Sequence, residues 1–288
     1  VWADDAMNRD PRFLRTRIRH EILPLLEAHF QPSPRPSLVA RLCRSADLVR
    51  AAVADLERRA AEVLDGAARS TAAGVVLPLA ALAAVSPGLA AEVVRLAAVR
   101  GGAASGLRGP SHRAIARAID PAVTASRAGL GRLVVERSGS WLRVGPRRLA
   151  PLGEHAWPVP GSLDLAERGI RLEARVFSRP AGYTPPGGTR AVAFDAARMP
   201  SALIVRARRA GDRFAPFGAP GSRRLKAFLI AAGVPRWERD RLPLVVAGDD
   251  IAWVVGCRRG RVAPVTAETS RILELTVHGP VAGESLPE

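Results

Sequence analysis

The sequence predicts an α+β multidomain protein, in which a helical middle domain is followed by a small α+β C-terminal domain with an antiparallel or mixed sheet. Two observations carry this prediction. In the first half of the chain apolar residues recur at helical spacing, and from about Leu130 they alternate with polar residues. The segment QPSPRPS at 31–37 is typical of an extended linker and therefore indicates a domain boundary.

The first helix is predicted to begin with Asp10 as its N-cap and Pro11 at its first helical position, and Pro24 should kink or end it. Its expected buried stripe is Leu14, Ile18, Ile22 and Leu25. Basic residues at three- and four-residue spacing form an exposed face of the same helix, which is either a solvated surface or a row of phosphate contacts: Arg12, Arg15 and Arg19.

A long amphipathic helix is predicted from Ser37 to about Asp65. Its expected inward positions are Leu38, Leu42, Val49, Val53, Leu56, Ala60 and Val63 or Leu64. After a turn at Gly74, further helices are expected at 87–99 and 111–119. Helical hairpins that pack together are the predicted architecture of this region.

The C-terminal half reads as a series of strands. A hairpin is predicted to turn at Ser138 and Gly139, and the later strands have the sequences GIRLEARVF, LIVRARR, LPLVVA, IAWVVG and RILELTV. The predicted division is a terminal helix at 1–31, a helical domain at 32–128, a β-rich connecting region at 129–200 and an α+β domain at 201–288.

The balance of 43 basic against 27 acidic residues gives a net charge of +16, which favours a polyanionic partner. Every basic residue except Lys226 is arginine, in a sequence that is also rich in Ala and Gly. Since a GC-rich coding sequence produces this composition, the sign of the charge is informative and the choice of arginine is not.

The two cysteines, Cys43 and Cys257, lack CxxC spacing, so neither a disulfide framework nor a metal site is predicted and a reducing cytoplasm fits. No signal peptide is recognised, and no apolar run approaches the roughly 18 residues of a membrane span. The first residue is Val1, which is expected of a fragment or of a non-standard start codon.

A basic stretch at 206–243 contains the most informative predicted helix, which begins at the N-cap Ser222 and ends before Gly233 and Pro235. Its buried stripe is expected to be Leu225, Phe228, Leu229 and Ala232. Its first turn would carry Arg223, Arg224 and Lys226. Cations there oppose the helix dipole, and a bound phosphate would remove the conflict; the alternative is a set of ordinary solvated charges.

The flanks of this helix extend the same positive surface. The basic residues on either side are Arg208, Arg209, Arg213, Arg236, Arg239 and Arg241. Trp237 lies among them and would either stack on a base or ribose or be packed in the protein. The stretch is therefore predicted to face a nucleic acid.

The order of these motifs carries a resemblance to a known family. RRAGDRFAPFG, SRRLKAFL and GVPRWERDRLPLVVAGDDIAWVVG resemble the C-terminal tRNA-binding domain of tRNA(Ile)-lysidine synthetases. The resemblance implies tRNA contacts for Arg208, Arg209, Arg213, Arg223, Arg224, Lys226, Arg236, Trp237 and Arg239.

A second motif of the same family lies in the first helix. The matching residues are Asn8, Asp10, Phe13, Arg15, Ile18, Arg19 and the run Leu23 to Leu26. In the family this segment borders the ATPase active site, so the resemblance assigns a catalytic border position to Arg15 and Arg19. Thr16 departs from the usual Asn and loses an amide's paired donor and acceptor.

The resemblance implies a ligase that activates the wobble cytidine of a minor isoleucine tRNA with ATP and joins lysine to it. Its expected small molecules are ATP, with magnesium, and lysine; its expected partner is tRNA, and a homodimer is among the expected assemblies. Residues 1–31 would then be the last helix of an ATPase domain, and 32–128 a substrate-binding linker domain.

The family's Ser-Gly-Gly-x-Asp-Ser pyrophosphate loop does not occur in this sequence, and neither does a Walker A, GxGxxG or HExxH pattern. The sequence is therefore expected to be a truncated synthetase that retains tRNA recognition and lacks catalysis by itself. A free-standing tRNA-binding protein is the alternative, and a basic protein with no nucleic-acid partner is a third reading.

Overall fold

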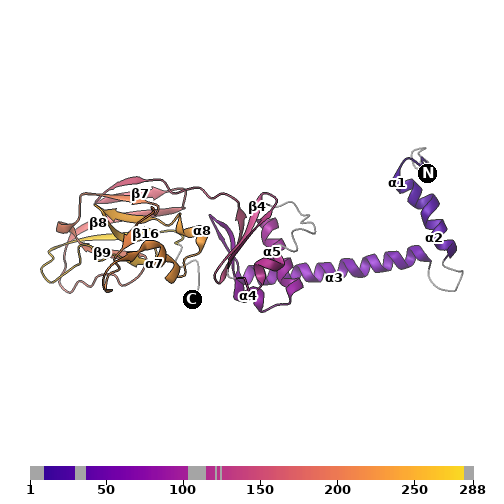
Figure 1. Cartoon of the computed structure of the whole chain (residues 1–288), viewed down its shortest axis with the longest axis horizontal. Coiled ribbons are helices and arrows are strands. Elements are labelled where there is room, and N and C mark those ends of the chain that lie inside the picture. Colours follow the sequence, from indigo (N-terminus) through magenta and orange to yellow (C-terminus); the bar gives the residue numbers. More distant parts are fainter. Residues whose placement is uncertain (1–9, 30–36, 103–114, 121, 124, 282–288) are drawn as a thin grey trace. The chain divides into compact units, whose positions relative to one another are not determined.

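The computed structural model describes residues 10–29, 37–102, 115–120, 122–123 and 125–281 (Figure 1). The chain divides into two compact units, Val1–Arg59 and Ala60–Glu288, and each is described by itself. In the described part of the chain, no helix combines the length and the hydropathy needed to cross a membrane.

The helical segment of the first unit begins later than predicted. Asp10 is not its N-cap, because the Asp10 carboxylate accepts hydrogen bonds from the backbone N–H of Arg12 at 2.9 Å and from the Arg12 guanidinium at 2.7 Å. Phe13 occupies the N-cap position without a side-chain bond. The segment consists of α1 (Leu14–Arg17), a π-helical turn η2 (Ile18–Ile22) and α2 (Leu23–His29).

Pro24 does not end this helix. Proline cannot donate an N–H and its ring crowds the carbonyl four residues earlier. The π turn before Pro24 provides a local widening, in which the Leu23 N–H reaches the Ile18 carbonyl five residues back. The chain therefore remains helical to His29.

The predicted buried stripe of this helix is exposed in the structure, as Leu14, Ile18, Ile22 and Leu25 all show. The same holds for the first part of α3 (Leu38–Ala67), which begins within one residue of the predicted start and is capped by the Ser37 hydroxyl. Its exposed apolar positions are Leu42, Val49 and Val53, while Ala60 and Leu64 are fully buried. Burial thus begins where α3 enters the second unit.

Residues 60–146 of the second unit, called the sheet module below, contain an antiparallel sheet with the strand order β1-β2-β5-β4-β3. Its strands are β1 (Arg69–Thr71), β2 (Gly74–Pro78), β3 (Ala125–Leu130), β4 (Leu133–Ser138) and β5 (Trp141–Pro146). The β4–β5 hairpin confirms the predicted turn, where Gly139 adopts φ +58°. Since β1 and β2 belong to the same sheet, the prediction of a purely helical middle region is not confirmed.

Helices cover one face of this sheet. They are the end of α3, α4 (Leu79–Ala83), α5 (Pro87–Arg100) and the helical residues 115–119. Ser86 caps α5 by accepting from the Leu89 N–H, and Val93 of α5 and Leu77 and Val144 of the sheet are fully buried between the layers.

Residues 155–281, called the C-terminal module, contain two further sheets. The first has the order β15-β14-β13-β10-β6 and the second the order β7-β8-β16-β9. The strands of the first are β6 (His155–Pro158), β10 (Ala202–Arg206), β13 (Leu244–Ala247), β14 (Asp250–Val254) and β15 (Arg258–Arg259). Those of the second are β7 (Gly161–Leu165), β8 (Ile170–Ser178), β9 (Ala191–Asp195) and β16 (Arg271–His278).

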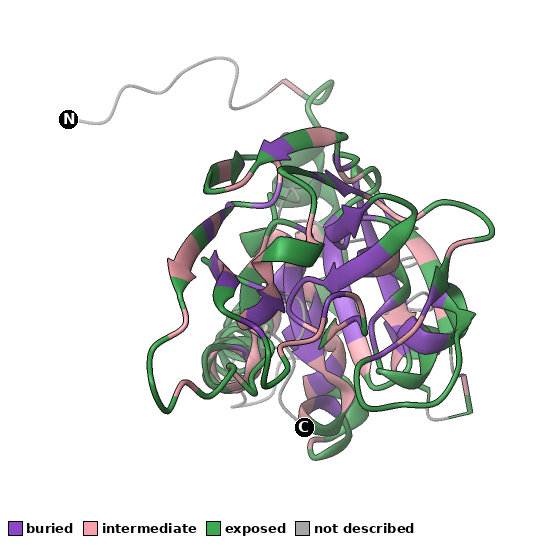
Figure 2. Cartoon of the chain, turned by 90° about the vertical axis from the view of Figure 1, so that its left-hand side faces the viewer, coloured by how far each residue is buried: buried purple, intermediate pink, exposed green. Residues whose placement is uncertain are grey.

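These two sheets share one apolar core. Trp157 and Trp253 from the first sheet and Phe194 and Leu273 from the second are all buried in it. Buried residues concentrate on the strands and exposed ones on the connecting loops (Figure 2). The α+β class that the sequence predicts is therefore confirmed, and the strands read from the period of two are present.

A third layer covers the other face of β13. It contains a two-stranded ribbon, β11 (Arg213–Phe214) and β12 (Arg223–Arg224), and the helices α7 (Leu225–Ala231) and α8 (Arg236–Arg239). Leu244 and Val246 of β13 pack with Phe228 and Leu229 of α7, whereas Val245 lies in the core between the sheets. Because both faces of β13 are covered, all four of its residues are buried.

Candidate nucleic-acid interface

The β11–β12 ribbon fixes how the predicted basic residues are presented. Arg213 is paired with Arg224 and Phe214 with Arg223 across the two strands. Directly opposite residues of an antiparallel pair extend to the same side. Arg213 and Arg224 therefore share one face of the ribbon, and Arg223 lies on the other face, where its guanidinium sits 5.0 Å from the centre of the Phe228 ring.

Asp212 holds the ribbon to the sheet. Its carboxylate, of which 13% is exposed, accepts two bonds from the Arg206 guanidinium at 2.9 and 3.0 Å and one from the Arg209 N–H at 2.7 Å. Its carbonyl accepts from the Leu225 N–H at 2.9 Å. Gly211 before it has φ +89°, a conformation that favours glycine. The Gly-Asp-Arg-Phe motif is thus a structural turn that places Arg213.

The environment of Asp212 also sets its ionisation. Burial by itself raises the pKa of this carboxyl, but the hydrogen bonds from Arg206 and from the Arg209 backbone, with the positive charges of both arginines, outweigh it. The net result is a pKa below the ordinary value. Asp212 therefore remains ionised and paired with Arg206 under neutral conditions.

The predicted start of the basic helix is wrong. The Ser222 hydroxyl accepts from Arg213 Nε at 3.1 Å and caps no helix, and α7 begins only at Leu225. Arg223 and Arg224 consequently lie on a strand before the helix, so they do not oppose a dipole from its first turn. The predicted end is confirmed, since Gly233 has φ +68° directly after the last helical turn.

A different electrostatic conflict takes the place of the helix dipole. Arg213 and Arg224 face each other in register, and like charges in that position repel. In the described part of the chain, no carboxylate lies within ion-pairing distance of the exposed cations of this segment, which are Arg213, Arg223, Arg224 and Lys226. Arg213 Nη2 donates to the Ser222 carbonyl at 2.7 Å, and phosphate groups would relieve the repulsion that remains.

A second basic cluster surrounds α8. The guanidinium groups of Arg208 and Arg236 lie near that of Arg239. Burial lowers the pKa of Arg239, and the positive charges of these two neighbours lower it further. Asp240 neutralises part of this cluster through a 2.5 Å ion pair with Arg208. Arg209 is paired separately with Glu154. The structure therefore divides the predicted basic residues into two groups. The ribbon cluster consists of Arg213, Arg223, Arg224 and Lys226, and the α8 cluster consists of Arg208, Arg236 and Arg239.

Trp237 is packed in the protein, which is one of the two positions that the sequence left open, so the tRNA contact that the resemblance implied for it is corrected. The side chain is 7% exposed and packs on Ala73 and Val76 of the sheet module. The guanidinium of Arg143 lies 5.7 Å from the centre of its ring. A base could not reach this ring without separating the two modules.

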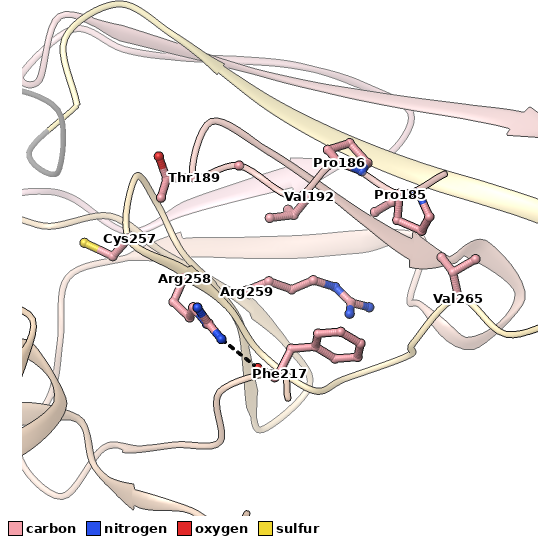
Figure 3. Close-up of a pocket in the computed structure, with 12 residues that line it drawn as sticks. Pro185, Pro186, Thr189, Val192, Phe217, Cys257, Arg258, Arg259 and Val265 are labelled. Atoms are coloured by element: carbon pink, nitrogen blue, oxygen red, sulfur yellow. Dashed lines mark hydrogen bonds between the residues drawn. The ribbon is translucent and has the colours of Figure 1, made fainter. Parts of the chain in front are cut away.

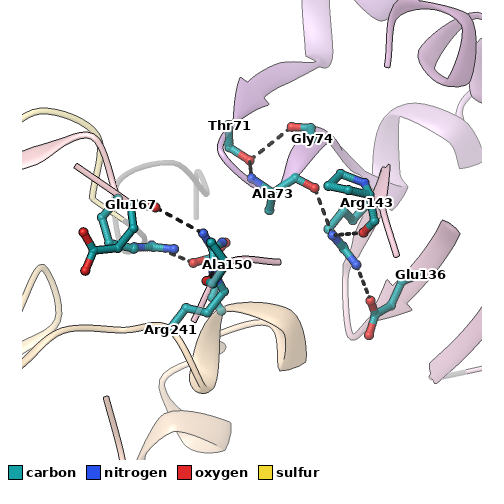
Figure 4. A network of polar contacts seen from close by, with 11 residues as sticks. Thr71, Ala73, Gly74, Glu136, Arg143, Ala150, Glu167 and Arg241 are labelled. Carbon is teal, nitrogen blue, oxygen red and sulfur yellow. Dashed lines mark hydrogen bonds and ion pairs between the residues drawn. The ribbon is translucent and has the colours of Figure 1, made fainter. Parts of the chain in front are cut away.

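The segment around Trp237 instead forms a junction between the modules, which sequence reasoning missed (Figure 4). On the sheet module Arg143 is buried and pairs with Glu136 at 2.8 Å. In the C-terminal module Glu238 pairs with Arg168 at 2.7 Å. Arg241, predicted as part of the positive surface, is 5% exposed and donates to the Ala150 carbonyl at 2.9 Å.

No local pattern marks this junction in the sequence, because its partners are about 70 to 165 residues apart. The Arg236 N–H, for example, donates to the hydroxyl of Ser138 at 2.9 Å. The one available signal is composition, because a Trp within a run of arginines is unusual in a purely solvated surface.

Arg15 and Arg19, the predicted catalytic border residues, are both exposed in the first unit. Two other arginines of this segment have acidic partners, since Arg12 pairs with Asp10 at 2.7 Å and Arg17 lies 3.7 Å from Glu21. The catalytic roles of Arg15 and Arg19 stay predictions. Over the described residues, no group of three His, Cys, Asp or Glu side chains is arranged to hold a metal ion.

The two free cysteines should differ sharply in reactivity. Cys43 is exposed, whereas burial raises the pKa of the Cys257 thiol to about 11. Because the thiolate is the reactive form, we expect a thiol-specific reagent at pH 8 to label Cys43 quickly and Cys257 much more slowly. Mass spectrometry of the modified peptides would check this, and early labelling of Cys257 would contradict it.

The sequence is similar to those of known proteins along most of its length. Residues 203–272 match the family model described as the TilS substrate C-terminal domain. The chain is 33% identical to the tRNA(Ile)-lysidine synthase of Symbiobacterium thermophilum, over 95% of this chain and 59% of that protein. It is 30% identical to that of Geobacter sulfurreducens, over 97% of this chain and 59% of that protein.

A crystal structure of a TilS C-terminal domain is 29% identical to this chain, covering 43% of it and 96% of that domain, with a TM-score of 0.38. The chain spans a little over half the length of the curated relatives that it matches. The family model and these relatives confirm the resemblance read from the sequence motifs: the chain belongs to the tRNA(Ile)-lysidine synthase family.

Proposed function

We propose that the chain is the tRNA-recognising part of a tRNA(Ile)-lysidine synthase, and that its ribbon cluster contacts the phosphate backbone of the tRNA. The observation that carries this proposal is the facing pair of Arg213 and Arg224, which has no acidic partner among the described residues. Such an arrangement is unfavourable in the isolated protein and favourable against a polyanion.

The α8 cluster supplies a second set of contacts in this proposal. Arg236 is exposed, and Arg208 and Arg239 are partly exposed beside it. The partial neutralisation by Asp240 makes this cluster the weaker of the two. Trp237 and Arg241 are excluded from the interface because both are buried in the junction.

The whole enzyme would use ATP, with magnesium, to join lysine to the wobble cytidine of a minor isoleucine tRNA. The proposed role of the described residues is contact with the tRNA. The alternative, a tRNA-binding protein without catalysis, would use the same ribbon cluster for the same contacts.

The proposal predicts a change in the salt dependence of tRNA binding. Replacing Arg223, Arg224 and Lys226 together by Ala should weaken binding. The slope of log K against log salt should fall by about 0.9 for each phosphate that the variant no longer neutralises. A filter-binding titration of the chain with isoleucine tRNA at several salt concentrations measures both quantities.

The matched control removes three exposed arginines from β8 and β16, namely Arg171, Arg175 and Arg271, and so changes the net charge equally. We expect its slope to stay close to that of the unaltered chain. If both triple variants reduce the slope by the same amount, binding depends on net charge alone and the ribbon cluster is not the site.

A further inference from the structure

The C-terminal module contains a cavity of about 320 Å³ that the proposed tRNA contacts do not use (Figure 3). It lies between the loop at 185–189 and the short strand β15. Its lining includes Pro186, Thr189, Phe217, Arg258 and Arg259. Two of these side chains are cationic, and none of the lining residues is acidic.

Arg259 is the unusual member of this lining. Its guanidinium lies 4.7 Å from the centre of the Phe194 ring and 4.3 Å from that of Phe217, and so is held between two aromatic faces. Its Nη2 atom reaches only the carbonyls of Val262 and Ala263, at 3.4 and 3.3 Å. Its Nε atom is buried without a hydrogen-bond partner.

No carboxylate of the described residues pairs with Arg259. Burial lowers the pKa of its guanidinium to about 10, which still leaves the group charged at neutral pH. Arg259 is half-buried, and a charge that is partly desolvated and has no counter-charge is costly to a fold. Its two ring contacts orient the planar guanidinium but do not neutralise it.

Further donors border the same cavity. Arg258 is exposed and its Nη2 donates to the Phe217 carbonyl at 3.2 Å, which holds the second guanidinium at the rim. Gly187 and Gly188 bring the backbone close to the cavity. An added Cβ at Gly187 would meet nothing within 4 Å, so the backbone there borders open space. Thr189 adds a hydroxyl, while the prolines and Phe217 offer apolar surface.

We propose that this cavity binds the phosphate ester of a nucleotide, with the phosphate on Arg259, the positive charge of Arg258 at the rim, and the ring of the nucleotide against Phe217 and the proline loop. Two cations without an acidic neighbour favour a phosphate over a carboxylate, and the apolar walls favour a ligand with a ring. The nucleotide is either free or at the 5′ end of an RNA strand. The inference does not require the ribbon cluster to bind tRNA.

Calorimetric titration of the chain with adenosine 5′-monophosphate and with adenosine tests the proposal. We expect the monophosphate to bind at least about tenfold more tightly, because the charge-assisted bonds exist only with the phosphate. Inorganic phosphate should compete with it. Equal binding of the two compounds, or binding of neither, would overturn the proposal.

Two variants assign the effect to the cavity. Arg259→Met should abolish the preference for the monophosphate and leave the midpoint of thermal unfolding unchanged or higher, since it removes a half-buried charge that no carboxylate of the described residues pairs with. Should Arg259→Met fail to fold, Arg258→Gln changes an exposed side chain and should still reduce the preference severalfold. Arg271→Gln, an exposed arginine on β16, is the matched control and should retain the preference in full.

A second arm distinguishes the source of the nucleotide. If a short oligoribonucleotide with a 5′ phosphate binds more tightly than the same strand with a 5′ hydroxyl, and inorganic phosphate competes with it, the ligand is an RNA end. Equal binding of the two strands, with the monophosphate preference intact, identifies a free nucleotide. The triple variant of the ribbon cluster should keep the monophosphate preference, so failure of either proposal leaves the other one testable.

Discussion

Replacing Asp212 by Asn is expected to lower the free energy of unfolding of the second unit by about 3 kcal/mol, because it leaves the buried Arg206 guanidinium without its counter-charge. Arg206 is 8% exposed and depends on Asp212 for a two-bond ion pair. The same change removes an acceptor for the Arg209 N–H. Urea denaturation followed by circular dichroism measures the loss.

The contribution of Asp212 should disappear in acid. Its pKa in the folded protein lies below the ordinary 3.8, so the stabilisation is present above that pH and is lost as the pH falls through the folded pKa. The unfolding free energies of Asp212→Asn and of the unaltered chain should therefore converge below about pH 3.8. A gap that stays constant from pH 7 to pH 3 would show that the carboxylate charge is not the cause.

Asp164→Asn is the matched control for this prediction. Asp164 is an exposed carboxylate, 3.9 Å from the exposed Arg171. Exposed pairs of this kind contribute about 0 to 1 kcal/mol. We expect a change within that range and no comparable dependence on pH.

The second large effect is expected at the junction between the two modules. Glu238→Gln should destabilise the second unit by about 3 kcal/mol or more, because it leaves the charges of Arg168 and Arg241 buried together. The side chains of these two arginines are only 9% and 5% exposed. Differential scanning calorimetry measures the loss. If the unaltered chain unfolds in one transition and the variant in two, one for each module, the junction couples the modules.

Two further variants make this prediction specific. Glu173→Gln removes an exposed carboxylate that pairs with His278 at 3.3 Å, and should have little effect. Replacing Arg168 and Glu238 together by Met should recover part of the stability, because an apolar pair leaves fewer buried charges unpaired. If the double variant is less stable than Glu238→Gln, the buried ion pair is itself a net source of stability.

The sequence predicts much of this fold where local pattern decides it. The period of two located β8, β10, β13, β14 and β16, and Ser37 and Gly233 marked helix ends correctly. These signals depend on neighbouring residues in the chain. The sheet partner of β2 could not be read in this way, since β5 lies about 65 residues further on.

The errors have the same physical origin. Ser222 has the right residue type for an N-cap, but its hydroxyl accepts from the Arg213 guanidinium, and the residues after it pair as strand β12 with β11. Trp237 and Arg241 lie among exposed arginines, yet the sheet module buries Trp237 and the backbone at Ala150 holds Arg241. Basic composition predicted the positive surface correctly as a region, while tertiary contacts decided which of its residues face solvent.

In the proposed interface, Arg213 and Arg224 face each other, which lowers the stability of the free protein and allows the pair to bind a polyanion. Arg224→Glu tests this most directly, by measuring unfolding free energy and tRNA affinity on the same variant. The cross-strand repulsion becomes an attraction, so stability should rise by about 0.2 to 1 kcal/mol while tRNA affinity falls. Arg271 faces Ser178 across its strand pair, so Arg271→Glu should not raise the unfolding free energy while lowering the tRNA affinity. A variant that is less stable and binds tRNA as tightly as the unaltered chain would contradict the account.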